Sequence, residues 1–217
     1  MGTFKKSVLA AITLTYFLIF IGGLVRVSGA GLGCPDWPKC FGRWVPPVSV
    51  AELPADIDPS SFNFALAWIE YLNRLLGMVV GLSVLWVAAL ALWRHRNERT
   101  ILWSSLAAAV SVALQGYQGG QVVASFLAPY MVSIHMVLAL LLIAFLLWAY
   151  QSAHLLSLPV SDFSPAGRNA SWMMYAAIAL TGVQVLSGTR VRGALETAGA
   201  QAPLLDAEAL FQQIAHW

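Results

Sequence analysis

The chain of 217 residues is 59% hydrophobic and only 10% charged, and its formal net charge is +2. A soluble domain carries roughly a quarter charged residues, because its surface has to be solvated. The composition therefore excludes an ordinary soluble domain. The few positive charges are too scattered to indicate nucleic-acid binding. The expected environment is the lipid bilayer, and the expected fold class is all-α integral membrane.

Five apolar stretches are long enough to cross the hydrocarbon core of a membrane, which takes about 20 residues. They are Val8–Val25, Leu66–Trp93, Ile101–Leu127, Tyr130–Tyr150 and Trp172–Val191. The first stretch follows Lys5 and Lys6, as in a signal peptide. It ends in GGLVRVSG, however, and not in a typical cleavage site, so we expect a helix that stays attached.

Basic residues precede the first stretch and fill the turn between the second and third. They are Lys5, Lys6, Arg94, Arg96 and Arg99. If the helices alternate in direction, both places lie on one side of the membrane, and the positive-inside rule makes that side the cytoplasm. No Arg-rich transit segment precedes the first stretch, so a bacterial cytoplasmic membrane is expected. The external loop 26–65 contains prolines that prevent a continuous helix.

A short pattern, G-x-x-V-R, closes two of the apolar stretches at the external boundary. It occurs as GGLVR at Gly22–Arg26 and as GTRVR at Gly188–Arg192. Membrane proteins often use internal repeats, and a parallel repeat of four helices would give eight. We therefore predict a first four-helix transmembrane half at 1–155. Residues 156–217 would start a second half, with a fifth helix at 172–191 and the beginning of a sixth, as in an amino-terminal fragment.

Two cysteines, Cys34 and Cys40, flank the sequence PDWPK in the external loop. On the oxidising side of a membrane, such a close pair most often forms a disulfide. Two free thiols or a redox-active pair remain alternatives. The spacing is unlike C-x-x-C, which weakens the case for a thiol oxidoreductase.

Polar side chains interrupt the second apolar stretch at WIEYLNR. Glu70, Asn73 and Arg74 stand at positions i, i+3 and i+4, which share one face of a helix. Glu70 and Arg74 could simply neutralise each other and lock two helices together. A buried ion pair in a membrane is costly, however, and is commonly kept for function. We favour the functional interpretation.

His135 lies inside the fourth apolar stretch. It could hydrogen-bond to a neighbouring helix, or its imidazole could be an axial ligand of heme iron. At 1.5 Å per residue, Asn73 and His135 lie about 10 Å and about 8 Å below the external ends of their stretches. Both positions therefore fall in one layer. His216, in the expected sixth helix, corresponds to the Asn73 region on the repeat hypothesis, whereas His95 and His154 look like ordinary solvated residues.

The third stretch carries Gln115, Gln118 and Gln121 among glycines that allow close approach of a helix or of a flat macrocycle. Helix packing alone would also explain the glycines. Arg26, at the external boundary, could pair with an anionic group such as a heme propionate, or it could be only an interfacial anchor.

Three segments together resemble the heme A synthase family. They are GGLVRVSGAGLGCPDWPKC at Gly22–Cys40, WIEYLNRLLG at Trp68–Gly77 and QGYQGGQVVASFLAPYMVSIHMVLAL at Gln115–Leu140. The resemblance implies two similar four-helix bundles, each with a heme site between histidines of its second and fourth helices. One site would bind heme O and the other a heme b that transfers electrons. The C8 methyl group of heme O would be oxidised to the formyl group of heme A, for cytochrome c oxidase assembly.

The resemblance also implies roles for individual residues. Glu70 matches the acidic residue of the family's E-x-x-H pattern, and is the expected catalytic residue. His135 and His216 match heme ligands, and the disulfide carries over onto Cys34 and Cys40. Independently of the resemblance, Asn73, Arg26 and Arg74 are expected to contact the cofactor.

The sequence departs from the family pattern at Asn73, which stands where the family has a histidine. Asparagine is a poor iron ligand, so the first heme would keep one protein ligand, with water or an open position opposite His135. The expected partner of His216, on an eighth helix, lies beyond the sequence. We therefore expect this chain alone to be inactive.

Partners and alternative functions follow from the same resemblance. Heme O synthase could hand over the substrate, and a homo-oligomer is an open expectation. The first alternative function is a non-catalytic membrane heme b electron carrier or oxidase assembly factor. The second is a membrane thiol oxidoreductase.

Overall fold

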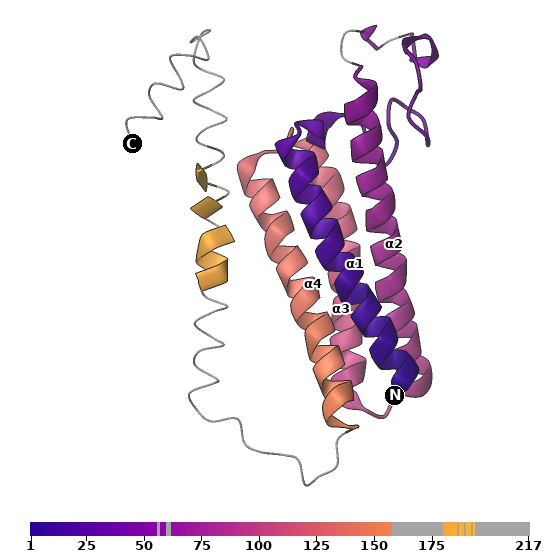
Figure 1. Cartoon of the computed structure of the whole chain (residues 1–217), viewed down its shortest axis with the longest axis vertical. Coiled ribbons are helices and arrows are strands. Elements are labelled where there is room, and N and C mark those ends of the chain that lie inside the picture. The colour runs from indigo at the N-terminus through magenta and orange to yellow at the C-terminus, as the bar shows by residue number, and fades with distance from the viewer. Residues whose placement is uncertain are drawn as a thin grey trace. The chain divides into compact units, whose positions relative to one another are not determined.

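The computed structural model describes residues 1–55, 57–59, 62–157, 180–185, 187, 188, 190, 191 and 193. Four long helices dominate this part of the chain (Figure 1). They are α1 (Gly2–Val27), α2 (Phe64–Arg94), α3 (Arg99–Ala124) and α4 (Pro129–Leu155). All 4 are long and apolar enough to span a membrane. The predicted all-α membrane fold is confirmed, and the chain is a multi-pass membrane protein.

The four helices form an up-and-down bundle. The main contacts join α1 to α2, α2 to α3, α3 to α4, and α4 back to α1. The helices α2 and α4 therefore stand at opposite corners, and α1 and α3 flank the diagonal between them. Two short 3-10 helices, η1 (Ala30–Leu32) and η2 (Val50–Glu52), lie in the segment that joins α1 to α2.

The helices extend beyond the predicted apolar stretches at most ends. The helix α1 begins at Gly2 and α4 continues to Leu155, because polar residues outside the bilayer also adopt helical structure. The third stretch was predicted too long. It ends at Ala124 because Phe126 and Leu127 adopt left-handed backbone angles, with φ of 51° and 60°, that turn the chain into α4.

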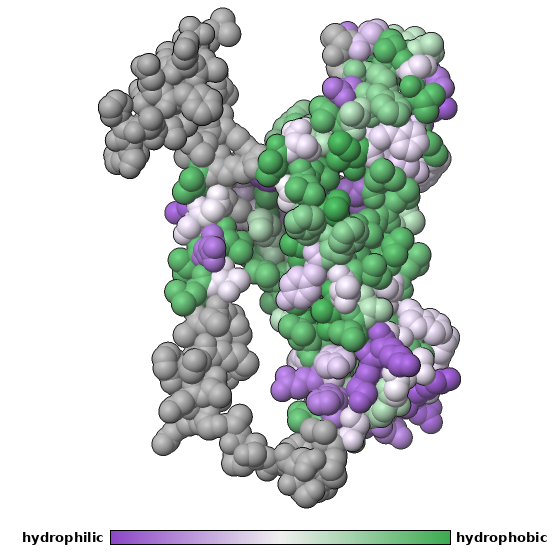
Figure 2. Space-filling model, viewed as in Figure 1, coloured by the Kyte–Doolittle hydropathy of each residue, from purple (hydrophilic) through white to green (hydrophobic). Residues whose placement is uncertain are grey.

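The two ends of the bundle differ in composition. One end, which we call the basic end, holds the N-terminus, the α2–α3 turn and the last turn of α4. Figure 2 shows hydrophilic residues gathered there beneath an apolar belt. The opposite end, which we call the loop end, holds the α1–α2 segment 28–63 and the α3–α4 turn 125–128.

The close-packed apolar core lies in the half of the bundle next to the basic end. All four helices contribute fully or almost fully buried side chains to it. They are Phe4, Val8, Ala11, Ile12, Val80, Val84, Val87, Leu90, Ala91, Ile101, Ala108, Leu142, Leu146, Ala149 and Ala153. The corresponding buried apolar residues of the helices in the loop-end half are fewer: Val25, Ala67 and Val132.

The chain divides into two compact units, Met1–Gly167 and Arg168–Trp217. In the second unit, residues 180–185, 187, 188, 190, 191 and 193 are helical, and nearly all of them fall within the predicted fifth helix at 172–191. The predicted sixth helix and His216 lie outside the described residues. The repeat of the first half in 156–217 stays a prediction.

Candidate functional site

The loop end is organised by a small disulfide-closed ring. Cys34 and Cys40 are bonded, with their Cα atoms 4.8 Å apart, and are 0% and 1% exposed. Inside the ring, the Asp36 carboxylate accepts hydrogen bonds from the backbone N–H groups of Phe41 (2.6 Å) and Gly42 (2.9 Å). The predicted disulfide is therefore present, and it closes a self-supporting turn.

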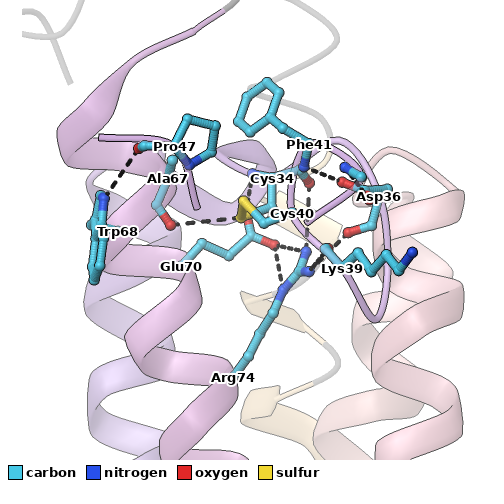
Figure 3. Close-up of a disulfide and its surroundings, with 11 residues drawn as sticks. Cys34, Asp36, Lys39, Cys40, Phe41, Pro47, Ala67, Trp68, Glu70 and Arg74 are labelled. Atoms are coloured by element: carbon cyan, nitrogen blue, oxygen red, sulfur yellow. Dashed lines mark hydrogen bonds and ion pairs between the residues drawn. A yellow bond between two sulfur atoms is a disulfide. The ribbon is translucent and has the colours of Figure 1, made fainter. Parts of the chain in front are cut away.

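Glu70 and Arg74 hold this ring to α2 (Figure 3). The Glu70 carboxylate pairs with the Arg74 guanidinium and accepts the backbone N–H of Cys34 at 2.8 Å. The guanidinium also donates to the carbonyl oxygens of Asp36 and Lys39, both at 2.8 Å, and to that of Cys34 at 3.5 Å. One buried ion pair thus satisfies several backbone groups that the ring cannot satisfy itself.

The disulfide ring packs closely against both α2 and α3. A Cβ on Gly33 would come within 2.3 Å of the Leu66 carbonyl oxygen, so only glycine permits this approach to α2. On the other side, the Trp37 ring lies 3.0 Å from the place a Cβ on Gly120 would take. Beside Trp37, an open pocket of about 380 Å³ is lined by residues from the ring and from α3, including Asp36, Tyr117 and Gln121.

Asn73 does not join the Glu70–Arg74 pair, contrary to the predicted convergence of the three side chains. Its amide oxygen Oδ1 is buried without a hydrogen-bond partner in the described part of the chain. It lies 3.9 Å from where a Cβ on Gly22 would be, so Asn73 faces α1. The spacing i, i+3, i+4 covers a face wide enough for Asn73 and Arg74 to diverge, by about 100° around the helix axis.

His135 lies against α3 from its position in α4. The Cε1 atom of its imidazole is 3.6 Å from where a Cβ on Gly119 would be. Its Nδ1 atom is buried and has no hydrogen-bond partner among the residues described. Its backbone carbonyl accepts a hydrogen bond from Gln115 Nε2 at 3.1 Å.

The glutamines of α3 behave in two ways. Gln118 is buried and donates through Nε2 to the Met131 carbonyl oxygen at 3.2 Å, so it ties α3 to α4 as Gln115 does. Gln121 instead lines the pocket beside Trp37. The amide oxygens Oε1 of Gln115 and Gln118 are buried and lack partners within the described ranges. Of the three glutamines predicted to form a polar lining, Gln115 and Gln118 therefore hydrogen-bond to α4, and Gln121 lines the pocket beside the disulfide ring.

Comparison with known proteins shows to which family the chain belongs. The sequence matches the family model described as cytochrome oxidase assembly protein (COX15-CtaA) over residues 5–215. The chain belongs to this family. It is 31% identical over 158 residues to a protein named heme A synthase from Shewanella oneidensis, covering 69% of this chain and 46% of that protein. Similar proteins of the same name come from Bartonella tribocorum and Hyphomonas neptunium, each 26% identical, with 81% and 88% of this chain covered.

The chain spans about half the length of these relatives: 46%, 54% and 60% respectively. The cytochrome oxidase assembly protein family thus extends across most of the sequence, and the match includes both the described bundle and the residues beyond it. His216 falls just outside the matched range and outside the described residues.

Two polar side chains at the loop end, on α2 and on α4, are chemically suited to contact a heme. His135 supplies an imidazole with an unpartnered buried nitrogen, and Asn73 supplies an unpartnered amide oxygen on the diagonally opposite helix. The flanking helices place Gly22 beside Asn73 and Gly119 beside His135, where larger side chains would fill the space. Among the residues described, no cluster of three or more His, Cys, Asp and Glu side chains could hold a bare metal ion.

The other predicted site residues lie at the loop end as well. Arg26 is half-buried in the last turn of α1, at the external boundary predicted for it. Arg74 and Glu70 have their contacts in the disulfide ring, a partner that no local pattern predicts, because the ring lies more than 30 residues earlier. The stacking of Trp37 on Gly120 and the bracing of α4 by Gln115 were not predicted either.

Proposed function

We propose that this chain is the amino-terminal half of a heme A synthase, which oxidises the C8 methyl group of heme O to the formyl group of heme A for cytochrome c oxidase assembly. The observation that carries the proposal is the family match over residues 5–215, with relatives named heme A synthase. The unpartnered polar atoms at the loop end support it, because such atoms in a membrane need partners that a bound group can supply.

In this proposal His135 would hold the heme iron in the first bundle. A neutral imidazole is a common ligand of heme iron, and the Nδ1 atom of His135 is buried. Asn73 lies on the opposite corner of the bundle and would contribute at most a weak amide contact to the heme. When bound, the heme supplies the iron and, as heme O, the methyl group to be oxidised.

The remaining side chains bind and orient the porphyrin. Arg26 would pair with a propionate, because a guanidinium forms charge-assisted hydrogen bonds with carboxylates. Arg74 and Glu70 hold the disulfide ring over the end of the bundle, where it limits access of water. A direct catalytic role for Glu70 stays part of the proposal, and Glu70→Gln tests it because the amide keeps the shape of the side chain.

The second bundle would bind a heme b for electron transfer, with His216 as one ligand. We also propose a bacterial cytoplasmic membrane as the location, with the basic end of the bundle in the cytoplasm. Transfer of heme O from heme O synthase, and assembly into a homo-oligomer, are further predictions that follow from the family resemblance.

The decisive experiment expresses the full-length protein together with a source of heme O, followed by extraction and chromatography of the hemes. We expect heme A to accumulate, and Glu70→Gln to reduce its amount while heme binding is retained. Folded, heme-loaded protein that yields no heme A would overturn the proposed activity.

Asn73 favours one alternative, a heme-binding electron carrier or assembly factor without catalysis. That protein would show a b-type spectrum and leave heme O unchanged in the same experiment. Replacing Asn73 by histidine would then give a second axial ligand, and its effect on heme A yield separates the two functions. A thiol oxidoreductase is disfavoured because Cys34 and Cys40 are buried, and replacing both with serine should lower stability without removing an active thiol.

A further inference from the structure

A pair of glutamines on α3 bonds to consecutive turns of α4 around His135. Gln115 Nε2 donates to the carbonyl oxygen of His135 at 3.1 Å, and Gln118 Nε2 donates to that of Met131 at 3.2 Å. Residues 131 and 135 are one helical turn apart. Two such bonds between helices fix both the height and the rotation of this part of α4 relative to α3.

These bonds use only half of each amide. Oε1 of Gln115 remains a buried acceptor without a partner in the described part of the chain, and so does Oε1 of Gln118. The imidazole of His135 also lacks a hydrogen bond, because its Nδ1 atom is buried and has no partner among the described residues. In a membrane, an unsatisfied polar group costs several kcal/mol, so these three atoms should acquire partners in the working protein.

Iron binding determines which kind of partner Nδ1 needs. If the other ring nitrogen, Nε2, binds iron, the neutral imidazole carries its proton on Nδ1, which becomes a donor. Metal-binding histidines almost always give this proton to an oxygen atom, which fixes the tautomer and the ring orientation. An amide oxygen is a suitable acceptor.

The contacts between α3 and α4 favour one of the two glutamines as this acceptor. The imidazole lies beside Gly119, which is one turn after Gln115 on α3. Gln115 is already bonded to the backbone of His135 itself, whereas Gln118 is bonded one turn away, at Met131. Gln115 is therefore the residue whose amide is held directly at the histidine.

We propose that Gln115 is a positioning residue for the heme ligand: its amide nitrogen anchors the His135 backbone and its amide oxygen accepts the Nδ1 proton of the imidazole. Gln118 fixes the preceding turn of α4. This inference rests on the proposed function only in taking His135 as an iron ligand, and it does not require that heme A be made.

The test measures the midpoint potential and the electron paramagnetic resonance spectrum of the His135-bound heme in purified full-length protein. An acceptor at Nδ1 makes the imidazole a stronger electron donor to iron, so its loss raises the potential. We expect Gln115→Leu to raise the potential and to weaken heme binding about tenfold. Gln115→Glu, which keeps the size and an acceptor oxygen, should give a potential equal to or below that of the unmodified protein.

Gln121→Leu is the matched control, because Gln121 lies on the same helix but lines the pocket beside Trp37. Its potential and spectrum should not change. Shifts of the same sign and size in Gln115→Leu and Gln115→Glu would overturn the inference, since a merely structural role does not distinguish an acceptor from an alkyl group. If Gln115→Leu does not accumulate, the Gln115→Glu protein decides alone, and a raised potential there contradicts the proposal.

His135→Ala separates this inference from the function. If that variant keeps an unchanged spectrum, His135 is not a ligand and both statements fall. If His135→Ala loses the signal but the Gln115 variants behave alike, only the role of Gln115 is wrong. If the Gln115 variants differ as expected and no heme A is formed, the inference stands and the proposed activity fails.

Discussion

The two halves of the bundle use the same helices for different purposes. Next to the basic end, all four helices interlock through buried aliphatic side chains, including Val84 and Leu146. Next to the loop end, the helices bury few apolar side chains. Asn73, Gln115 and His135 each have an unpartnered polar atom there in the described part of the chain, and Asn73 and His135 lie beside glycines. The half next to the basic end is closely packed by itself, whereas in our proposal a bound heme completes the half next to the loop end.

The largest expected effect comes from removing the proposed heme ligand at the loop end. His135→Ala should remove nearly all heme from the first bundle, because Asn73 is a poor iron ligand and cannot replace the imidazole. Heme content per protein and the absorption spectrum measure this change. His154→Ala is the control, because His154 lies at the other end of α4. Unchanged heme in His135→Ala would show that the loop end is not completed by iron ligation there.

The next effect concerns the ion pair that attaches the disulfide ring. Arg74→Ala leaves the Glu70 carboxylate buried without its partner, because the two side chains are only 16% and 5% exposed. The expected loss is about 3–5 kcal/mol in the free energy of unfolding, measured in detergent.

An exposed ion pair supplies the control for Arg74. Arg43 pairs with Glu52 at 3.3 Å, with exposures of 48% and 37%, and Arg43→Ala should change the unfolding free energy by less than about 1 kcal/mol. Equal losses in the two variants would show that burial at the loop end does not strengthen the Glu70–Arg74 pair.

A pair of leucines on α4 compares the packing of the two halves directly. Leu146 is fully buried in the core near the basic end, so Leu146→Ala should cost about 2–5 kcal/mol. Leu138 is only half-buried on the loop-end side, and Leu138→Ala should cost clearly less. Thermal unfolding of the heme-free protein checks both. A larger loss at Leu138 would mean that the loop-end half is as closely packed as the other.

The smallest effect is a dependence of stability on pH at the basic end. The prediction that His95 is solvated was wrong, because His95 is only 7% exposed and packs against Phe4. Burial lowers the pKa of His95 from its ordinary value of 6.5, although Glu98 opposes the shift and the N-terminus and Arg94 add to it. The folded protein therefore keeps His95 neutral where the unfolded chain binds a proton. This contribution to stability is present above pH of about 6.5 and is lost as the pH falls below it.

His95→Gln tests this assignment, because glutamine does not titrate. The unfolding free energy of the variant should fall less than that of the unmodified protein between pH 7.5 and 5.5, by about 1 kcal/mol or less. Parallel pH curves for the two proteins would assign the acid sensitivity to other groups.

The sequence predicted what depends on local pattern. Apolar length marked all four helices, and the four-residue spacing placed Glu70 and Arg74 on one helix face, where they form an ion pair. The sequence did not predict contacts between segments that are far apart along the chain. Nothing in the pattern near Arg74 indicates that it bonds to the Asp36 carbonyl, and no periodicity reveals that Gln115 reaches His135. Composition also missed the left-handed turn at Phe126, because apolar residues continue through it.

The hydrogen bonds from Arg74 to the disulfide ring also affect which residues of the ring can be substituted. The guanidinium binds the carbonyl oxygens of Asp36 and Lys39, atoms that every amino acid possesses. The side chain at position 39 can therefore change, for example to alanine or threonine, while the anchorage is kept. The exposed side chains of the ring can thus change and form a recognition surface, while the backbone hydrogen bonds that attach the ring to Arg74 are kept.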